Sequence, residues 1–251
     1  MITRFLLLTF ISLFTISCNS TDEYEVFLLI GQSNMAGRAP MTEEDKQAID
    51  GVWLLDSLGN VAPAISPLNQ YSSIRKGIKM QEVSIANGFA KEIKKYTDKK
   101  VLLIVNARGG TKIELWQKGN TETPYFEEAV RRCREASKYG KIKAILWHQG
   151  ESNSDNYDEY MNNLTRLATD LRTELGSDKI PFIAGEVGRW NEYAGDFNPV
   201  INTISSHIPY SDFVSSESAG MRSNLKDPHF SRDGELLLGK RYAEKVNSLV
   251  Y

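Results

Sequence analysis

The stretch that decides the fold is Phe27–Arg38, with the sequence FLLIGQSNMAGR. Its first four residues are apolar, as in a buried strand, and Gly-Gln-Ser-Asn then leads into a segment that can begin a helix. A serine at such a turn holds its hydroxyl clear of the sheet edge, where the amides of the helix start face a developing negative charge. Ser33 is therefore a candidate nucleophile, and a helix N-cap is the structural alternative.

Size and composition are those of a globular protein. The chain has 251 residues, of which 41% are hydrophobic and 25% charged, so it fits one large α/β domain or at most two small ones. A formal net charge of -2 gives no reason to expect nucleic acid or an anionic membrane surface as a partner. The metal spacings His-Glu-x-x-His and Cys-x-x-Cys do not occur, and neither does a glycine-rich phosphate loop, so we expect no metal and no cofactor.

The N-terminus has the pattern of an export signal over residues 1–17. One arginine precedes an apolar run over residues 5–16, which is too short to span a bilayer comfortably. The residues around Cys18 resemble a bacterial lipoprotein processing site, with a threonine where that signal usually has leucine. We expect an exported protein, periplasmic or at the cell surface, with Cys18 as the lipidated first mature residue and 18–23 as a tether. A plain signal peptide or an uncleaved anchor stays open.

From residue 24 onward, apolar strands alternate with helical patterns. We expect strands at 27–30, 101–105, 142–147, 181–186 and 212–215, a short hairpin at 52–60, and helices at 83–96, 125–139, 155–175, 199–207 and 233–249. Continuous apolar strands separated by helices are typical of a parallel sheet covered on both faces. We therefore expect a single domain over 24–251, a three-layer αβα sandwich of the flavodoxin-like kind, and leave its oligomeric state open.

Polar or glycine-rich segments follow four of these elements, at residues 32–34, 108–110, 148–151 and 227–229. In open parallel sheets, ligands bind beyond the carboxyl ends of the strands. We expect these four segments to converge on one edge of the sheet.

A serine becomes a nucleophile when a base takes its proton, and histidine is the usual base. His229 is the best candidate of the three histidines, because it stands in a loop before a helix and two residues after Asp227. His148 ends a strand beside the expected location of Ser33 and fits a base and a buried core histidine equally well, whereas His207 fits a structural or solvent-facing position. Met35 occupies the place where the α/β-hydrolase elbow needs glycine, which argues against that fold.

Four blocks of sequence together resemble the conserved blocks of the SGNH hydrolases. They are residues 31–37 (GQSNMAG), Gly109–Thr111 with Trp116, residues 147–151 (WHQGE) and residues 227–230 (DPHF). The nearest branch is the one that holds acetylxylan esterases and sialate O-acetylesterases, and the resemblance runs from about Tyr24 to the C-terminus. It implies an αβα fold of the SGNH type and a serine esterase that removes O-acetyl groups from a carbohydrate.

The resemblance also implies roles for individual residues. Ser33 would attack the acetyl carbonyl, and His229 would take its proton and pass it to the departing sugar oxygen. The oxyanion hole would consist of the Ser33 amide, a glycine amide at Gly109 or Gly110, and the side-chain amide of Gln149.

One block departs from the family pattern. The last block is usually D-x-x-H, but Asp227 precedes His229 by two residues and Lys226 stands at the expected position. Glu151, at the end of a neighbouring strand, is the obvious substitute. We favour Glu151 as the residue that orients His229 and keep Asp227 as the alternative.

Two other functions fit the same residues. The altered spacing could leave a catalytically weak or inactive carbohydrate-binding lipoprotein, and the superfamily also contains lipases and thioesterases. No motif loop indicates a long acyl channel, which favours acetyl. The sequence does not decide between acetylated xylan and sialic acid, and it leaves open whether Arg38, Trp116, Arg189 or Trp190 lines the pocket.

Overall fold

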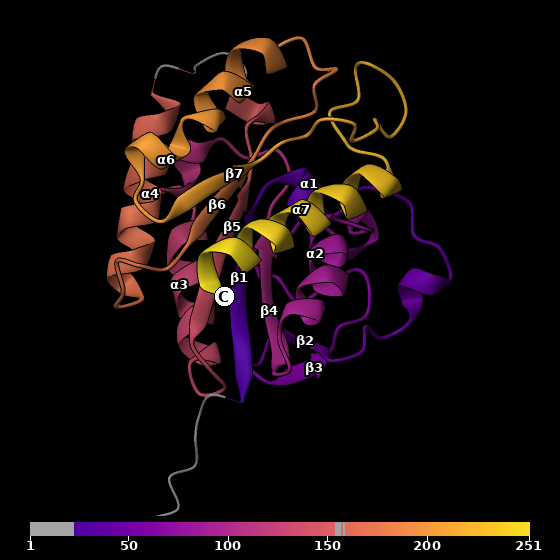
Figure 1. Ribbon diagram of the computed structural model, residues 1–251, viewed down its shortest axis with the longest axis vertical. Coiled ribbons are helices and arrows are strands. Elements are labelled where there is room, and N and C mark those ends of the chain that lie inside the picture. Colours follow the sequence, from indigo (N-terminus) through magenta and orange to yellow (C-terminus); the bar gives the residue numbers. More distant parts are fainter. Residues whose placement is uncertain (1–22, 154–156, 158) are drawn as a thin grey trace, which may run out of the picture.

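The structure is a computed structural model that describes residues 23–153, 157 and 159–251 (Figure 1). The leader predicted at 1–17, the lipidation predicted at Cys18 and most of the 18–23 tether lie outside the described residues and stay predictions. Within the described ranges, no helix is both long enough and apolar enough to cross a membrane.

A seven-stranded sheet forms the middle layer, in the order β3-β2-β4-β1-β5-β6-β7. Its strands are β1 (Tyr24–Gly31), β2 (Val52–Leu55), β3 (Val61–Pro63), β4 (Lys100–Ala107), β5 (Ile142–His148), β6 (Phe182–Gly185) and β7 (Ser211–Val214). All neighbouring strands are parallel except β2 and β3, which form the expected hairpin at one edge. All eight residues of β1 are buried, as its apolar sequence predicts for a central strand.

Helices cover both faces of this sheet. Helices α2 (Ile85–Ile93) and α7 (Arg232–Val250) pack against each other on one face, as Figure 1 shows. The other face carries α3 (Tyr125–Ala136), α4 (Tyr160–Glu174), α5 (Ala194–Asn202) and α6 (Ile204–His207). Alternate residues of β1 enter two separate cores, with Leu28 and Ile30 in one and Phe27 and Leu29 in the other. The expected three-layer αβα sandwich is confirmed.

Short helices complete the connections. They are α1 (Ser33–Ala36) and the 3-10 turns η1 (Glu44–Lys46), η2 (Ile78–Met80), η3 (Lys94–Tyr96), η4 (Ile113–Trp116) and η5 (Glu151–Asn153). Both α1 and η5 follow strands at the carboxyl edge of the sheet, so the segments that carry the motif residues lie together there.

The helix expected at 199–207 is wrong in its bounds. Helix α5 begins five residues earlier and holds Pro199 in its interior, and α6 is a separate turn. The earlier start is explained by Phe197 and Ile201, which lie one helical turn apart and are both fully buried. Burial of this apolar pair decides the helix start, although a proline usually marks the first turn.

Candidate active site

The turn that carries Ser33 is fixed by close backbone contact with β5. Gly31 has a φ of 131°, and a Cβ at this position would lie 2.1 Å from the carbonyl oxygen of His148. The Gln32 amide donates to that same oxygen at 2.9 Å. The N-cap of α1 is Gln32, so the structural alternative for Ser33 is wrong: Ser33 is the first residue of the helix itself.

His229 is held by Asp227. Its Nδ1 lies 2.7 Å from Asp227 Oδ1, which also accepts the backbone N–H of His229 at 3.1 Å. Asp227 Oδ2 accepts hydrogen bonds from Arg222 Nε at 2.8 Å and from Ser223 Oγ at 2.6 Å. The two-residue spacing between the aspartate and the histidine therefore allows the carboxylate–imidazole hydrogen bond.

These contacts set the charge of both groups. Burial acts to raise the pKa of Asp227, but the hydrogen bonds from Ser223, Arg222 and His229 outweigh it and lower the pKa to about 2. Burial lowers the pKa of His229 below its usual value, and Asp227 offsets only part of this effect. A neutral imidazole beside an ionised carboxylate is the arrangement that a general base requires.

Glu151 does not occupy the position that we favoured for it. Its Oε1 accepts a hydrogen bond from Asn34 Nδ2 at 2.6 Å, and its Oε2 has no hydrogen-bond partner among the described residues. Burial raises the pKa of Glu151 to about 7. The residue bound to His229 is Asp227, the alternative, because the turn of its own loop brings that carboxylate back onto the ring.

Asn34 was not singled out from the sequence, although it directly follows Ser33. It is fully buried, its Nδ2 donates to the carbonyl of Pro228 at 3.3 Å, and its Oδ1 accepts the N–H of Phe230 at 3.3 Å. These two backbone groups flank His229. Asn34 therefore connects the nucleophile helix to the histidine loop and to Glu151.

The expected oxyanion donors differ in their positions. A Cβ on Gly109 would lie 3.3 Å from Ser33 Cβ, and both Gly109 and Gly110 line the same pocket as Ser33. Gln149 is fully buried and does not line that pocket.

The Gln149 amide is occupied elsewhere. Its Nε2 lies within hydrogen-bond distance of three acceptors: Gln32 Oε1 (3.1 Å), Thr111 O (2.9 Å) and Asn153 Oδ1 (2.7 Å). The amide has only two hydrogens, so none is left for a substrate. The structure therefore does not place Gln149 as an oxyanion donor. Its place is in a polar network behind the site, because a buried amide must satisfy its own hydrogen bonds.

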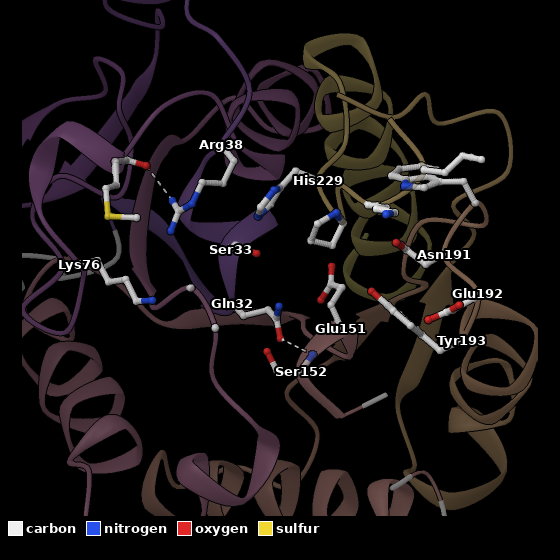
Figure 2. Close-up of a pocket in the computed structure, with 17 residues that line it drawn as sticks. Gln32, Ser33, Arg38, Lys76, Glu151, Ser152, Asn191, Glu192, Tyr193 and His229 are labelled. Atoms are coloured by element: carbon white, nitrogen blue, oxygen red, sulfur yellow. Dashed lines mark hydrogen bonds between the residues drawn. The ribbon is translucent and has the colours of Figure 1, made fainter. Parts of the chain in front are cut away.

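A cavity of about 890 Å³ opens at this edge of the sheet. Figure 2 shows Ser33, His229 and Glu151 reaching it from three different segments. Arg38 and Trp190 also line it. Trp116 does not, because it is fully buried in the core, and Arg189 lies outside the lining and pairs with Glu186 at 3.1 Å.

The other two histidines lie outside this pocket lining. His148 is fully buried beside the hydroxyl of Tyr242 at 3.1 Å, and burial lowers its pKa to about 3. His207 ends helix α6. In the part of the chain that the structure describes, no group of three or more His, Cys, Asp or Glu side chains could hold a metal ion.

Comparison with known families decides the class of protein. The model of the family described as carbohydrate esterase, sialic acid-specific acetylesterase, matches residues 23–248. The chain belongs to this carbohydrate esterase family. The resemblance found in the sequence blocks is confirmed, and so is a carbohydrate esterase as the class of enzyme.

One protein sequence and two solved structures illustrate what this carbohydrate esterase is similar to. A probable carbohydrate esterase of Arabidopsis thaliana is 28% identical over 243 residues, which cover 88% of this chain and 89% of that protein. An X-ray structure from Arabidopsis thaliana has a TM-score of 0.78 at 24% identity, covering 90% of this chain and 99% of the other. A carbohydrate acetylesterase from Xanthomonas citri has a TM-score of 0.67 at 15% identity, covering 90% of this chain and 56% of the other. At these identities the solved structures establish the fold.

Proposed function

We propose that this carbohydrate esterase removes O-acetyl groups from a sugar through an acyl-enzyme on Ser33. The observation that carries the proposal is the 2.7 Å hydrogen bond between His229 Nδ1 and Asp227 Oδ1, in a loop that lines the same pocket as Ser33. The nucleophile Ser33, the base His229 and the carboxylate of Asp227 that orients the base then lie together at one edge of the cavity.

In the first half of the proposed reaction, Ser33 Oγ forms a bond to the acetyl carbon while His229 Nε2 takes the hydroxyl proton. The π electrons of the carbonyl move to its oxygen, which becomes the oxyanion. When this intermediate collapses, the bond between the acetyl carbon and the sugar oxygen breaks, and His229 returns the proton to that oxygen. Water repeats the sequence on the acetyl-serine, and acetate leaves.

The pocket supports a sugar as the leaving group. Polar side chains of Gln32, Ser152, Asn191 and Tyr193 belong to its lining and can hydrogen-bond to hydroxyl groups. The family description names sialic acid, and the similar protein of Xanthomonas citri is a carbohydrate acetylesterase. We propose O-acetylated sialic acid or acetylated xylan as the substrate.

The experiment that tests this function is acetate release by the purified protein from acetylated xylan, O-acetylated sialic acid and p-nitrophenyl acetate. Butyrate and octanoate esters run beside them, and Ser33→Ala is the control. Release that depends on Ser33 and declines with acyl length is expected. Activity retained by Ser33→Ala would end the serine mechanism, and a preference for octanoate would turn the assignment to a lipase or thioesterase.

If the folded protein is inactive on every ester, the remaining hypothesis is the carbohydrate-binding lipoprotein. That alternative depended on the altered spacing of Asp227 and His229. Since the two residues are hydrogen-bonded at this spacing, we prefer the active enzyme.

The place where the enzyme acts is a separate proposal. The apolar run at 5–16 followed by Cys18 supports export and lipid attachment. Mass spectrometry of the protein from its native host is the test, and an unmodified Met1 terminus would contradict cleavage and lipidation at Cys18.

A further inference from the structure

The guanidinium of Arg38 lies against Gly109, whose amide is one of the donors expected at the oxyanion. A Cβ built on Gly109 would lie 2.4 Å from Arg38 Nη2 and 3.3 Å from Ser33 Cβ. One glycine thus separates the nucleophile from a cation, and all three residues line the cavity. Figure 2 shows the guanidinium on the same side of the cavity as Ser33.

Arg38 is held in place by only one of its terminal nitrogens. Nη1 donates to the carbonyl of Gly37 at 2.5 Å and to the carbonyl of Met80 at 2.8 Å. Nη2 forms no hydrogen bond or ion pair with the residues that the structure describes. Because the guanidinium is planar, the bonds of Nη1 also fix the direction of Nη2. The free N–H groups are therefore positioned before a substrate arrives.

The side-chain donor that the family resemblance implies for the oxyanion hole is not available in this structure. Gln149, the donor expected from the family resemblance, is fully buried and occupied by three acceptors. The amides of Ser33 and Gly109 remain, and Arg38 Nη2 lies against Gly109. A donor that carries a full positive charge forms a shorter and stronger hydrogen bond to an anion than a neutral amide does.

We propose that Arg38 donates a hydrogen bond from Nη2 to the oxyanion that forms when Ser33 attacks the acetyl group, in place of Gln149. The inference rests on the serine mechanism proposed above. The carbonyl of the bound ester is neutral and gains its charge only as the Ser33 Oγ–carbon bond forms. Arg38 therefore stabilises the transition state more than the bound substrate, and its loss lowers kcat more than it changes KM.

A second role is open to the same cation, and it predicts a different result. Arg38 could bind a carboxylate on the sugar, in which case only acidic substrates would need it. A neutral substrate with no sugar separates the two roles, because p-nitrophenyl acetate offers Arg38 an oxyanion and no carboxylate.

The test compares Arg38→Gln with the wild-type protein on p-nitrophenyl acetate. We expect kcat to fall about 10²–10³-fold, the usual cost of one oxyanion donor, with little change in KM. Lys79→Gln is the matched control, since it removes a cation from the turn that holds Met80 but lies outside the pocket lining. Its kcat should equal that of the wild type.

Unchanged kcat of Arg38→Gln on this ester would overturn the proposal, including the case in which KM rises only for an acidic sugar. Thermal unfolding shows whether the variant folds. If it does not, Arg38→Lys decides instead: it keeps the charge but has a single nitrogen, so a wild-type kcat would overturn the proposal and a loss of tenfold or more supports it. Activity that survives in Ser33→Ala would instead refute the serine mechanism itself.

Discussion

Trp190 donates its indole N–H to the backbone carbonyl of Asp227 at 2.8 Å. Its ring also packs edge-on against Phe230, with 5.0 Å between the ring centroids. Trp190 therefore contacts the histidine loop on both sides of His229, from a segment almost forty residues away, and it lines the pocket as well. A side chain in this position limits the movement of the base.

Trp190→Phe should lower kcat several-fold and reduce the free energy of unfolding by about 1 kcal/mol. The phenyl ring keeps the contact with Phe230, but the hydrogen bond to Asp227 is lost. Steady-state kinetics and chemical unfolding measure the two effects. Trp53→Phe is the control, since it loses an indole on strand β2, outside the pocket lining, and equal kinetic effects of both variants would contradict the positioning role.

Asp227→Asn should lower kcat by about 10⁴-fold, because an asparagine amide favours the wrong tautomer of His229. Glu151→Gln should cost much less, since Glu151 contacts Asn34 and forms no hydrogen bond with His229. This ranking reverses the one that the sequence favoured. Hydrolysis of p-nitrophenyl acetate by both variants tests it, and a larger loss in Glu151→Gln would restore Glu151 as the orienting residue.

The pH dependence of kcat/KM should follow His229. Burial lowers the pKa of this imidazole, Asp227 opposes that effect, and the positive charges of Arg222 and Arg38 lower the pKa further. Activity should therefore rise with pH and reach half of its plateau below about 6.5, the pKa of an unperturbed histidine. In Arg222→Gln one positive charge is gone, so the midpoint should move to higher pH. A midpoint of the wild type above 6.5 would contradict this prediction.

Glu235→Gln should stabilise the protein at neutral pH. Glu235 is fully buried where α7 packs on the start of α2, and burial raises its pKa well above the usual value. The unfolded chain ionises this carboxyl above its ordinary pKa of about 4.3 while the folded chain keeps it neutral, so stability is lost as pH rises from there toward the folded pKa.

Glutamine has the same shape and no proton to lose. Tm of Glu235→Gln should rise by roughly 2–4 °C for each kcal/mol regained at pH 7, and the difference from the wild type should shrink at pH 4. A gain in Tm that is equal at both pH values would show that ionisation of Glu235 is not its cause.

Several features of this protein follow from the sequence alone. Strands such as 101–105 are apolar at every position, and only a parallel sheet with helices on both faces buries such a strand on both sides. That topology places the ends of β1, β4 and β5 at one edge, so Ser33 and Gly109 could be assigned to one site. His229 could be chosen as the base because it stands in a loop before a helix and two residues after Asp227.

Other features depend on the tertiary structure. Which carboxylate reaches His229, whether the Gln149 amide faces the pocket and where the Arg38 guanidinium points are decided by hydrogen bonds between segments far apart in the chain. A shift of a few ångströms makes or breaks such a bond, and the spacing of residues in a motif does not specify it. Hydrophobic burial tolerates such shifts, and for this reason the fold was predictable from sequence while the hydrogen-bond partners at the site were not.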